Sequence, residues 1–450
     1  MSWLAAALDE TASYPAPETL DTFRASIEGE WIEEALAATG TATLRKRRLP
    51  AESVIWLVLG MALERDRPIA EVATKLDLVM PASDGSSRVA PSSVAQARSR
   101  LGEEPLQWLF ERCSMQWAME SARAHTWRDL TVFAADGTTL RVADSGQNRE
   151  HFGLANGGHR GDSAYPMARL ASLVAVRSHL VAAASFGPYA KSEYAYAQDL
   201  WPSVPNDSVT IVDRNYLAAA VLLGLQNEGE NRHWLIRAKK TTKWAELESF
   251  GRFDKLVEMT VSGSARTKDP SLPKSFTARV VGYKHPDSKG RQWLLTSLTD
   301  PKKYPAREVV ALYHERWEIE PGYDEIKTHL LEREETIRSR TVVTVRQELW
   351  GILLTYNLIR LEMERIADEA GLPPTRISFV AAMRFIRDEW SWCAYASPGS
   401  IPKKLRRMRE RILSFVLPPR RSERRYPRAV KIKMSSYPKK RREAAKRSAK

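Results

Sequence analysis

A fifteen-residue stretch from Tyr313 to Lys327, "YHERWEIEPGYDEIK", combines residue types suited to binding metal ions and phosphates. At about 100° per residue on a helix, four of its polar side chains fall within one sector of about 60°. These residues are Tyr313, Arg316, Glu320 and Lys327. A carboxylate on this line could bind a divalent cation, and two cations with a phenol could contact phosphates. The alternative is a solvated stripe with an Arg316–Glu320 ion pair.

An apolar stripe runs beside the polar one and predicts that this helix packs against a sheet. It consists of Leu312, Ile319, Tyr323, Ile326 and Leu330. Glu320 then lies at the margin of the buried face, and Trp317 belongs to neither stripe. Pro321 interrupts the pattern because proline lacks a backbone donor and disfavours helical geometry in the residue before it. A kink or a new helix at Pro321 would change the direction of Lys327.

Two aspartates directly follow short apolar runs that resemble buried strands. Asp136 follows "LTVFAA" and Asp213 follows "SVTIV". We expect each aspartate to end its strand, where the sheet fixes its position and its carboxylate reaches the rim. The alternative for each is an aspartate that only forms a turn. Asp144 is a second candidate for the first carboxylate, but it lacks the strand that leads into Asp136.

The pattern along the chain predicts an α/β protein in five parts. Apolar periodicity indicates a helical N-terminal domain over residues 1–125. Short β-rich runs predict a buried sheet with covering helices over residues 126–225 and a second β-rich block over residues 226–300. Helical patterns return over residues 301–390, and we expect residues 391–450 to form a basic segment for DNA binding or oligomerisation.

Within the N-terminal part, Gln96, Arg98 and Arg100 decorate a short helix of small residues. Such a helix would suit entry into a DNA groove. A helical bundle with an exposed arginine face explains the same pattern, and the sequence leaves both interpretations open.

The net charge of +14 is concentrated in the tail. From Pro402 to Lys450, 20 Lys and Arg stand against three acidic residues, which is +17, so the rest of the chain carries 14 − 17 = −3. A basic tail on a nearly neutral body indicates a nucleic-acid partner. A disordered solubilising tail is the alternative.

The remaining composition argues against a membrane protein and a disulfide framework. The sequence has no apolar run of about 18 residues and no signal-peptide pattern at its start. Its two cysteines, Cys113 and Cys393, suggest buried side chains in a reducing compartment. We therefore expect a cytoplasmic location, with no membrane partner.

Together these residues resemble the DDE triad of the ribonuclease-H-like transposases. The spacing from Tyr313 through Arg316 and Glu320 to Lys327 is similar to the YREK signature of one branch of bacterial insertion-sequence transposases. That branch carries a β insertion between its second aspartate and its glutamate. Here 320 − 213 = 107 positions separate those two residues, and the β-rich block lies between them. The helical N-terminal part and the basic C-terminal segment also resemble the family's DNA-binding regions.

The resemblance implies a ribonuclease-H-like fold and a role for each residue of the pattern. Asp136, Asp213 and Glu320 would be the catalytic carboxylates and would hold two Mg²⁺ or Mn²⁺ ions. The residues implied as DNA-phosphate contacts are Tyr313, Arg316, Lys327, Arg237 and Lys239. Trp293 occupies the position of an aromatic residue that stacks on a flipped base; a half-buried strand tryptophan is the alternative.

The implied partners are double-stranded DNA with terminal inverted repeats, target DNA and a second copy of the chain in a synaptic complex. The implied reaction is cleavage at the ends of an insertion sequence followed by strand transfer. Two other functions stay open at this point. One is an inactive or domesticated DNA-binding relative, and the other is a metal-dependent nuclease without strand transfer.

Overall fold

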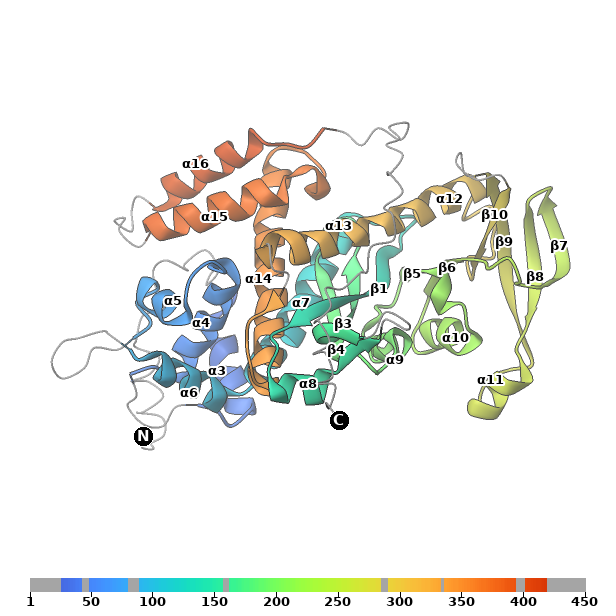
Figure 1. Ribbon diagram of the computed structural model, residues 1–450. Coiled ribbons are helices and arrows are strands. Elements are labelled where there is room, and N and C mark those ends of the chain that lie inside the picture. The colour runs from blue at the N-terminus through green and yellow to red at the C-terminus, as the bar shows by residue number, and fades with distance from the viewer. Residues whose placement is uncertain are drawn as a thin grey trace, which may run out of the picture.

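The computed structural model describes residues 26–42, 48–79, 89–156, 162–284, 290–332, 336–393 and 401–418. Figure 1 shows a central sheet, a helical N-terminal part to one side of it and a β-rich extension at the other end. A long helix, α14 (Val342–Glu369), lies between the N-terminal helices and the sheet. The basic segment from residue 419 onward lies outside the described residues.

The core is one mixed sheet whose central strands have ribonuclease-H-like order, as predicted. β1 (Thr131–Val142) pairs antiparallel with β3 (Asp162–Ala175) and parallel with β5 (Ser208–Val212). β3 also pairs antiparallel with β4 (Val181–Pro188), and β5 also pairs parallel with β6 (Arg232–Arg237). Short strands β2 (Leu154–Asn156) and β11 (Thr336–Ile337) pair with β3 and β1.

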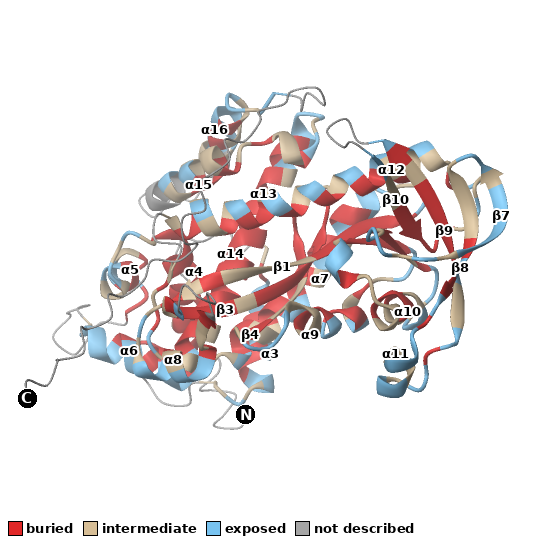
Figure 2. Ribbon diagram, turned by 45° about the vertical axis from the view of Figure 1, so that its right-hand side comes forward, coloured by how far each residue is buried: buried red, intermediate tan, exposed pale blue. Residues whose placement is uncertain are grey.

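The apolar runs of the sequence become central strands because helices cover them. All five residues of β5 are buried, as are the first five of β1. Contacts to β1 come from α7 (Glu104–Ala124), α9 (Glu193–Gln198) and α13 (Ile319–Asp324). Figure 2 shows the resulting layer of buried residues through the sheet and α14. The fold class, a mixed α/β sheet with flanking helices, is confirmed.

The β-rich block extends the same sheet. β10 (Arg291–Thr296) pairs antiparallel with β6, and β9 (Ser275–Lys284), β8 (Asp254–Thr260) and β7 (Ala245–Gly251) follow in order. The predicted insertion, residues 226–300, thus begins with β6, a strand of the central parallel set. Two helices accompany this region: α10 (Ala219–Asn227) and α11 (Gly263–Lys268).

The N-terminal part is helical, and its helices pack on one another and on α7 and α14. They are α3 (Gly29–Ala38), α4 (Ala51–Leu63), α5 (Ile69–Lys75) and α6 (Pro91–Leu101). The described part of the chain has no helix long and apolar enough to cross a membrane.

Arg98 on α6 does not face a DNA groove. It is 3% exposed and donates hydrogen bonds to Gln347 Oε1 at 2.8 Å and to Ser339 Oγ at 3.0 Å. Gln96 and Arg100 are exposed. Both interpretations that the sequence left open are wrong for Arg98, because it shares the buried face of α6 with Val94 and Leu101. Its polar partners there are Gln347 of α14 and Ser339.

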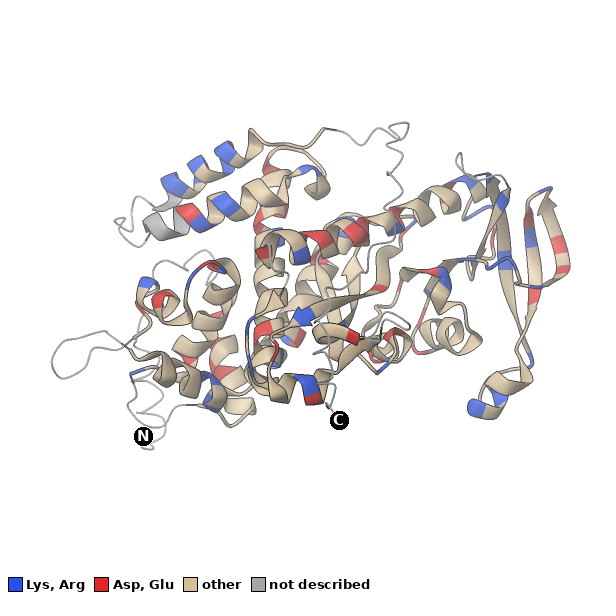
Figure 3. Ribbon diagram, viewed as in Figure 1, with Lys and Arg blue, Asp and Glu red and all other residues tan. Residues whose placement is uncertain are grey.

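After α14 the chain forms two further helices that pack on each other, α15 (Phe379–Cys393) and α16 (Ile401–Leu413). Figure 3 shows Lys and Arg positions along α16, both basic and acidic positions on α15, and acidic positions along α13. Cys113 is buried and unpaired, as expected, and the side chain of Cys393 lies outside the described residues.

Candidate active site

The stretch from Tyr313 to Lys327 lies in one run of helical turns from Ala306 to Leu330. It comprises α12 (Ala306–His314), a 3₁₀ segment (Glu315–Glu318), α13 and a π-helical segment (Glu325–Leu330). Pro321 lies inside α13, so no new helix begins there. The backbone tightens into the 3₁₀ segment just before Pro321 and widens into the π segment after it, and these changes accommodate the missing donor.

The apolar stripe is buried as predicted. Leu312, Ile319, Tyr323, Ile326 and Leu330 are each at most 9% exposed. Figure 2 shows the exposed and buried bands alternating along α12 and α13, as expected for a helix that lies on a sheet. The Tyr323 hydroxyl hydrogen-bonds the backbone carbonyl of Asp136 at 2.6 Å and Ser172 Oγ at 2.8 Å. Tyr323 thus links the helix directly to the strand of the first aspartate.

A buried polar network fixes the other side of the helix. Glu325 accepts a hydrogen bond from the Tyr356 hydroxyl at 2.8 Å and forms an ion pair with Arg360 at 3.3 Å. His179 Nε2 lies 3.0 Å from Glu318, and its Nδ1 contacts Arg360. Burial alone would raise the pKa of Glu325, but Arg360 and His179 lower it to about 2. This network holds the helix rigidly over the sheet.

Asp136 and Asp213 lie side by side on neighbouring parallel strands. The last residues paired between β1 and β5 are Ala135 and Val212, and each aspartate comes next. Asp213 ends its strand, as predicted. Asp136 does not: β1 continues to Val142 because β3 still pairs with it through Arg141. The expectation that both aspartates end their strands is therefore wrong for Asp136, although its parallel pairing does stop there.

Arg316 lies between the first aspartate and the glutamate. Its Nη1 is 3.6 Å from Asp136 Oδ2, and its Nη2 is 3.4 Å from Glu320 Oε1. Arg316 is 8% exposed and its buried Nε has no hydrogen-bond partner among the described residues. The Glu320 side chain is 44% exposed, so it has room to turn. The ion pair that the sequence offered as an alternative does form, but the same arginine also contacts Asp136.

The surroundings of Asp136 favour its protonated form. Burial raises the pKa of its carboxyl to about 6, the N–H of Gly137 opposes this, and the negative charge of Glu193 adds to it. Arg316 lowers the pKa again and Asp213 raises it slightly. Burial is therefore the main cause of the raised pKa, and the negative charges of Glu193 and Asp213 add to it more than the buried Arg316 offsets.

Glu193, at the start of α9, is a site residue that the sequence did not indicate. A Cβ atom added to Gly137 would lie 2.3 Å from Glu193 Cγ, so the glycine leaves the space in which this side chain lies. The Tyr216 hydroxyl donates a hydrogen bond to Glu193 Oε1 at 2.7 Å. In the sequence, Gly137 after Asp136 is the one sign that another side chain packs closely there, and it does not indicate which side chain.

Tyr313, Lys327 and Arg237 also border this site. Tyr313 is 5% exposed; burial raises its pKa to about 12, and Arg316, Asp213 and Arg237 are among the charges that act on it. Lys327 Nζ is 3.5 Å from Thr138 Oγ1, two residues beyond Asp136 on β1. The structure therefore brings these residues to the same region as the carboxylates, including Lys327 despite Pro321.

Lys239 and Trp293 are not joined to the carboxylates by any contact between described residues. Lys239 is exposed, two positions after Arg237. Trp293 is half-buried on β10, with its ring against Gly282 and edge-on to Trp244 at 5.8 Å. This packing accounts for the tryptophan as a strand residue, and its base-stacking role stays a prediction.

The donor set suits hard divalent cations, because carboxylate oxygens are the ligands that Mg²⁺ and Mn²⁺ prefer. The negative charges of Glu193 and Asp213 around Asp136 would also attract such a cation. Within the described ranges, however, no three acidic, histidine or cysteine side chains are already arranged to hold one ion. The arrangement seen is one in which Arg316 partly neutralises Asp136 and Glu320.

Comparisons with known proteins define the class to which this fold and site belong. Residues 127–358 match the family "Transposase DDE domain", and residues 17–111 match "Insertion element 4 transposase N-terminal". The chain is a DDE transposase, an enzyme of phosphoryl transfer on DNA, and the DDE domain implies catalysis with divalent metal ions.

Relatives narrow the assignment. The chain is 37% identical over 415 residues to "Transposase InsG for insertion sequence element IS4" of Escherichia coli (strain K12), which covers 92% of each chain. It therefore belongs to the insertion element 4 family of transposases, which transpose insertion sequences. It is also 35% identical over 277 residues, 59% of its own length and 91% of the relative's, to "Putative transposase InsZ" of the same organism.

A solved structure, "piggyBac transposase synaptic complex with hairpin DNA", aligns with 91% of this chain and 87% of its own at 12% identity, with a TM-score of 0.41. A similarity this loose adds nothing to the assignment.

Proposed function

We propose that Asp136, Asp213 and Glu320 together hold two divalent metal ions and that the helix from Ala306 to Leu330 presents phosphate-binding side chains beside them. One observation carries this proposal. Two aspartates on adjacent parallel strands lie beneath a helix whose Arg316 contacts both Asp136 and Glu320. When bound, the ions activate the attacking hydroxyl and stabilise the leaving oxygen of an in-line displacement.

Arg316 has two alternative roles in this proposal. Without DNA its guanidinium neutralises Asp136 and Glu320. When a DNA phosphate enters, Arg316 turns to the phosphate and Glu320 is released toward Asp136 and Asp213. The half-exposed side chain of Glu320 permits this movement, and the buried stem of Arg316 keeps its guanidinium at the site.

In this proposal, the other side chains that border the site contact DNA. Lys327 and Arg237 neutralise phosphates on either side of the scissile bond, and the Tyr313 hydroxyl donates a hydrogen bond to one of them. Lys239, exposed beyond Arg237, extends this contact along the backbone. The proposed substrate is double-stranded DNA that ends in the element's terminal inverted repeats, and the proposed acceptor is target DNA.

The proposal is tested with the element's own ends, whose inverted repeats can be read from the DNA that flanks the gene. Purified protein is incubated with Mg²⁺ and a labelled end, and cleaved and joined products are measured. We expect Glu320→Gln to lower both by at least about a thousandfold, since it removes a metal-binding carboxylate. Asp324→Asn, an exposed position on the same helix, is the matched control and should retain activity.

Retained activity in Glu320→Gln would overturn the site assignment. Cleavage without joined product in the wild-type protein would indicate a nuclease and not strand transfer. The homodimer that we expect in the synaptic complex stays a prediction. Measuring the mass of the protein with and without end DNA checks it, and one chain per DNA end without pairing would contradict it.

A further inference from the structure

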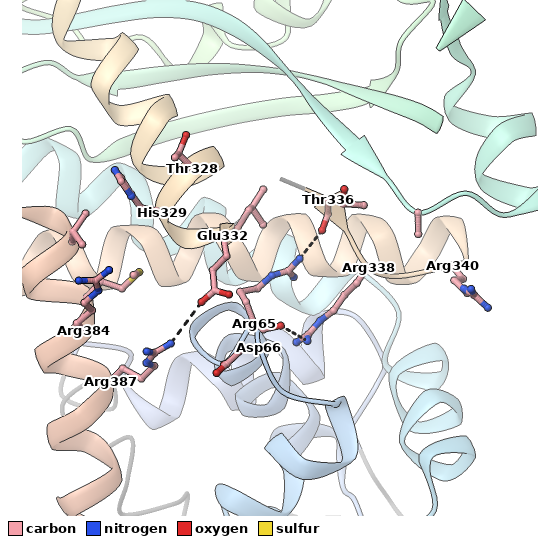
Figure 4. Close-up of a pocket in the computed structure, with 14 residues that line it drawn as sticks. Arg65, Asp66, Thr328, His329, Glu332, Thr336, Arg338, Arg340, Arg384 and Arg387 are labelled. Carbon is pink, nitrogen blue, oxygen red and sulfur yellow. Dashed lines mark hydrogen bonds and ion pairs between the residues drawn. The ribbon is translucent and has the colours of Figure 1, made fainter. Parts of the chain in front are cut away.

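A cavity of about 660 Å³ lies where the N-terminal part, the end of the active-site helix and α15 meet. The loop after α4 contributes Arg65 and Asp66, and the π segment contributes Thr328 and His329. Further lining residues that the argument uses are Ala143, Glu332, Arg338, Arg340, Arg384 and Arg387. Figure 4 shows Arg384 and Arg387 at one end of the cavity, Arg340 at the other, and Arg65 and Arg338 between them.

The cavity is strongly basic. Five arginines line it against Asp66 and Glu332, so the charge is 5 − 2 = +3 with His329 neutral. Burial, and then the positive charge of Arg65, lower the pKa of Arg338 to about 10; Glu348 opposes this and Arg98 adds to it. So many cations close together repel one another, and a bound anion would relieve that repulsion.

Three of the five arginines hold the protein together. Arg65 pairs with Glu348 at 2.5 Å, and Arg338 donates to the backbone carbonyls of Met61 and Arg67 at 3.0 and 2.7 Å. Arg387 lies 3.7 Å from Glu332. The exposed Arg340 and Arg384 are different, because the described part of the chain offers neither guanidinium an acidic partner.

We propose that this cavity binds the phosphate backbone of the DNA whose scissile bond lies at the carboxylates. This inference rests on the proposed function. Arg340 and Arg384 stand at opposite ends of the cavity, so a strand that passes through can contact both, whereas one small anion cannot (Figure 4). Arginine is well suited to such contacts because its planar fork matches phosphate oxygens.

The position along the DNA follows from the strand that joins the two sites. Ala143 lines the cavity and directly follows β1, seven positions after Asp136. At about 3.3 Å per residue this is about 23 Å. DNA advances about 3.4 Å per nucleotide, so a DNA strand that runs along β1 would reach the cavity about seven nucleotides from the scissile bond.

The test compares Arg340→Ala/Arg384→Ala with wild type on two duplexes that carry the cleavage position. One extends about 20 base pairs on both sides, and the other only about four. For the long duplex we expect affinity to fall at least about tenfold, and the slope of log K against log salt to fall by about two. For the short duplex we expect no change in binding. Phosphate ethylation about seven nucleotides from the cleavage position should impair wild-type binding only.

Arg123→Ala, an exposed arginine of α7 outside the cavity, is the matched control, and thermal unfolding checks that each variant folds. Unchanged binding of the long duplex, or an equal loss on both duplexes, would overturn the proposal. A third outcome would also overturn it: ATP stabilises the wild type but not the double variant, while binding of the long duplex is unchanged. The cavity would then bind a small anion and not DNA. Cleavage of the short duplex, which depends on Glu320, tests the proposed function separately.

Discussion

One helical run, Ala306 to Leu330, connects two regions of opposite charge. At its middle, Arg316 contacts Asp136 and Glu320, and the charges of Glu193 and Asp213 act on the same Asp136 carboxyl. At its end, Thr328 and His329 face the five arginines of the cavity. An acidic region attracts metal ions and a basic one attracts phosphates. On our proposals, the helical run between them sets the distance between the reacting bond and the DNA held in the cavity.

The two regions also differ in how their charges are balanced. In the acidic region the ionised form of a buried carboxyl is disfavoured, and Arg316 compensates only in part. In the basic region, Arg65, Arg338 and Arg387 are held by the fold, and Arg340 and Arg384 are the two arginines that we propose bind DNA. On our proposals, binding uses the charges that the fold pairs incompletely or not at all.

The largest expected effect comes from Asp136→Asn, which should separate activity from stability. Cleavage should fall by at least about a thousandfold. The folded state raises the pKa of Asp136 from 3.8 to about 6, so the ionised carboxylate lowers the free energy of unfolding. This cost is complete above about pH 6 and absent below pH 3.8. Without metal, the variant's free energy of unfolding at pH 8 should therefore rise, by up to about 3 kcal/mol.

Urea unfolding with EDTA at pH 8 and at pH 3.5 checks this sign, since the gain should vanish at the lower pH. A variant that is less stable than wild type at pH 8 would show that Asp136 is a structural residue, and the acidic region would then be no functional counterpart of the cavity.

The next effect tests whether the helix is a rigid link. Glu325→Gln leaves Arg360 without its buried partner and should cost about 3–5 kcal/mol of unfolding free energy. Tyr356→Phe, which removes one hydrogen bond to the same carboxylate, should cost only about 1 kcal/mol. Chemical denaturation measures both. Equal losses in the two variants would argue against the buried charge as the main anchor.

The same carboxylate predicts an acid response. The pKa of Glu325 is lowered from 4.5 to about 2, so its contribution is present above pH 4.5 and is lost as the pH falls toward 2. The difference in stability between wild type and Glu325→Gln should shrink over that range.

The smallest expected effect concerns Arg316, which competes with metal ions for the carboxylates of the acidic region. At pH 8 and without DNA, Arg316→Ala should bind Mn²⁺ several-fold more tightly, because the cation that competes for Asp136 and Glu320 is removed. With end DNA, its cleavage should fall about 10- to 100-fold, since a phosphate contact is lost. Arg340→Ala is the control from the basic cavity, and calorimetry should find its Mn²⁺ affinity unchanged. Weaker Mn²⁺ binding by Arg316→Ala would contradict the competing role of the arginine.

Much of the core follows from local patterns in the sequence. The apolar run before Asp213 makes a fully buried strand, since only a strand covered on both faces tolerates such a run. The stripe from Leu312 to Leu330 buries one side of the helix, and helical spacing alone places Arg316 near Glu320. These features depend on residues close in sequence, so periodicity is enough to predict them.

Contacts between distant segments decided the rest. Pairing with β3 carries β1 past Asp136, and the space beside Gly137 brings in Glu193 from 56 positions later, 193 − 137. Arg98 looks like a DNA contact in the sequence and is buried, because Gln347 lies across from it. The arginines of the cavity come from three separate segments and show no pattern along the chain. The sequence by itself determined which residue types were present for metal and phosphate chemistry. Only the tertiary structure decided which charges neutralise one another and which are left to bind, because that depends on distances that no local spacing encodes.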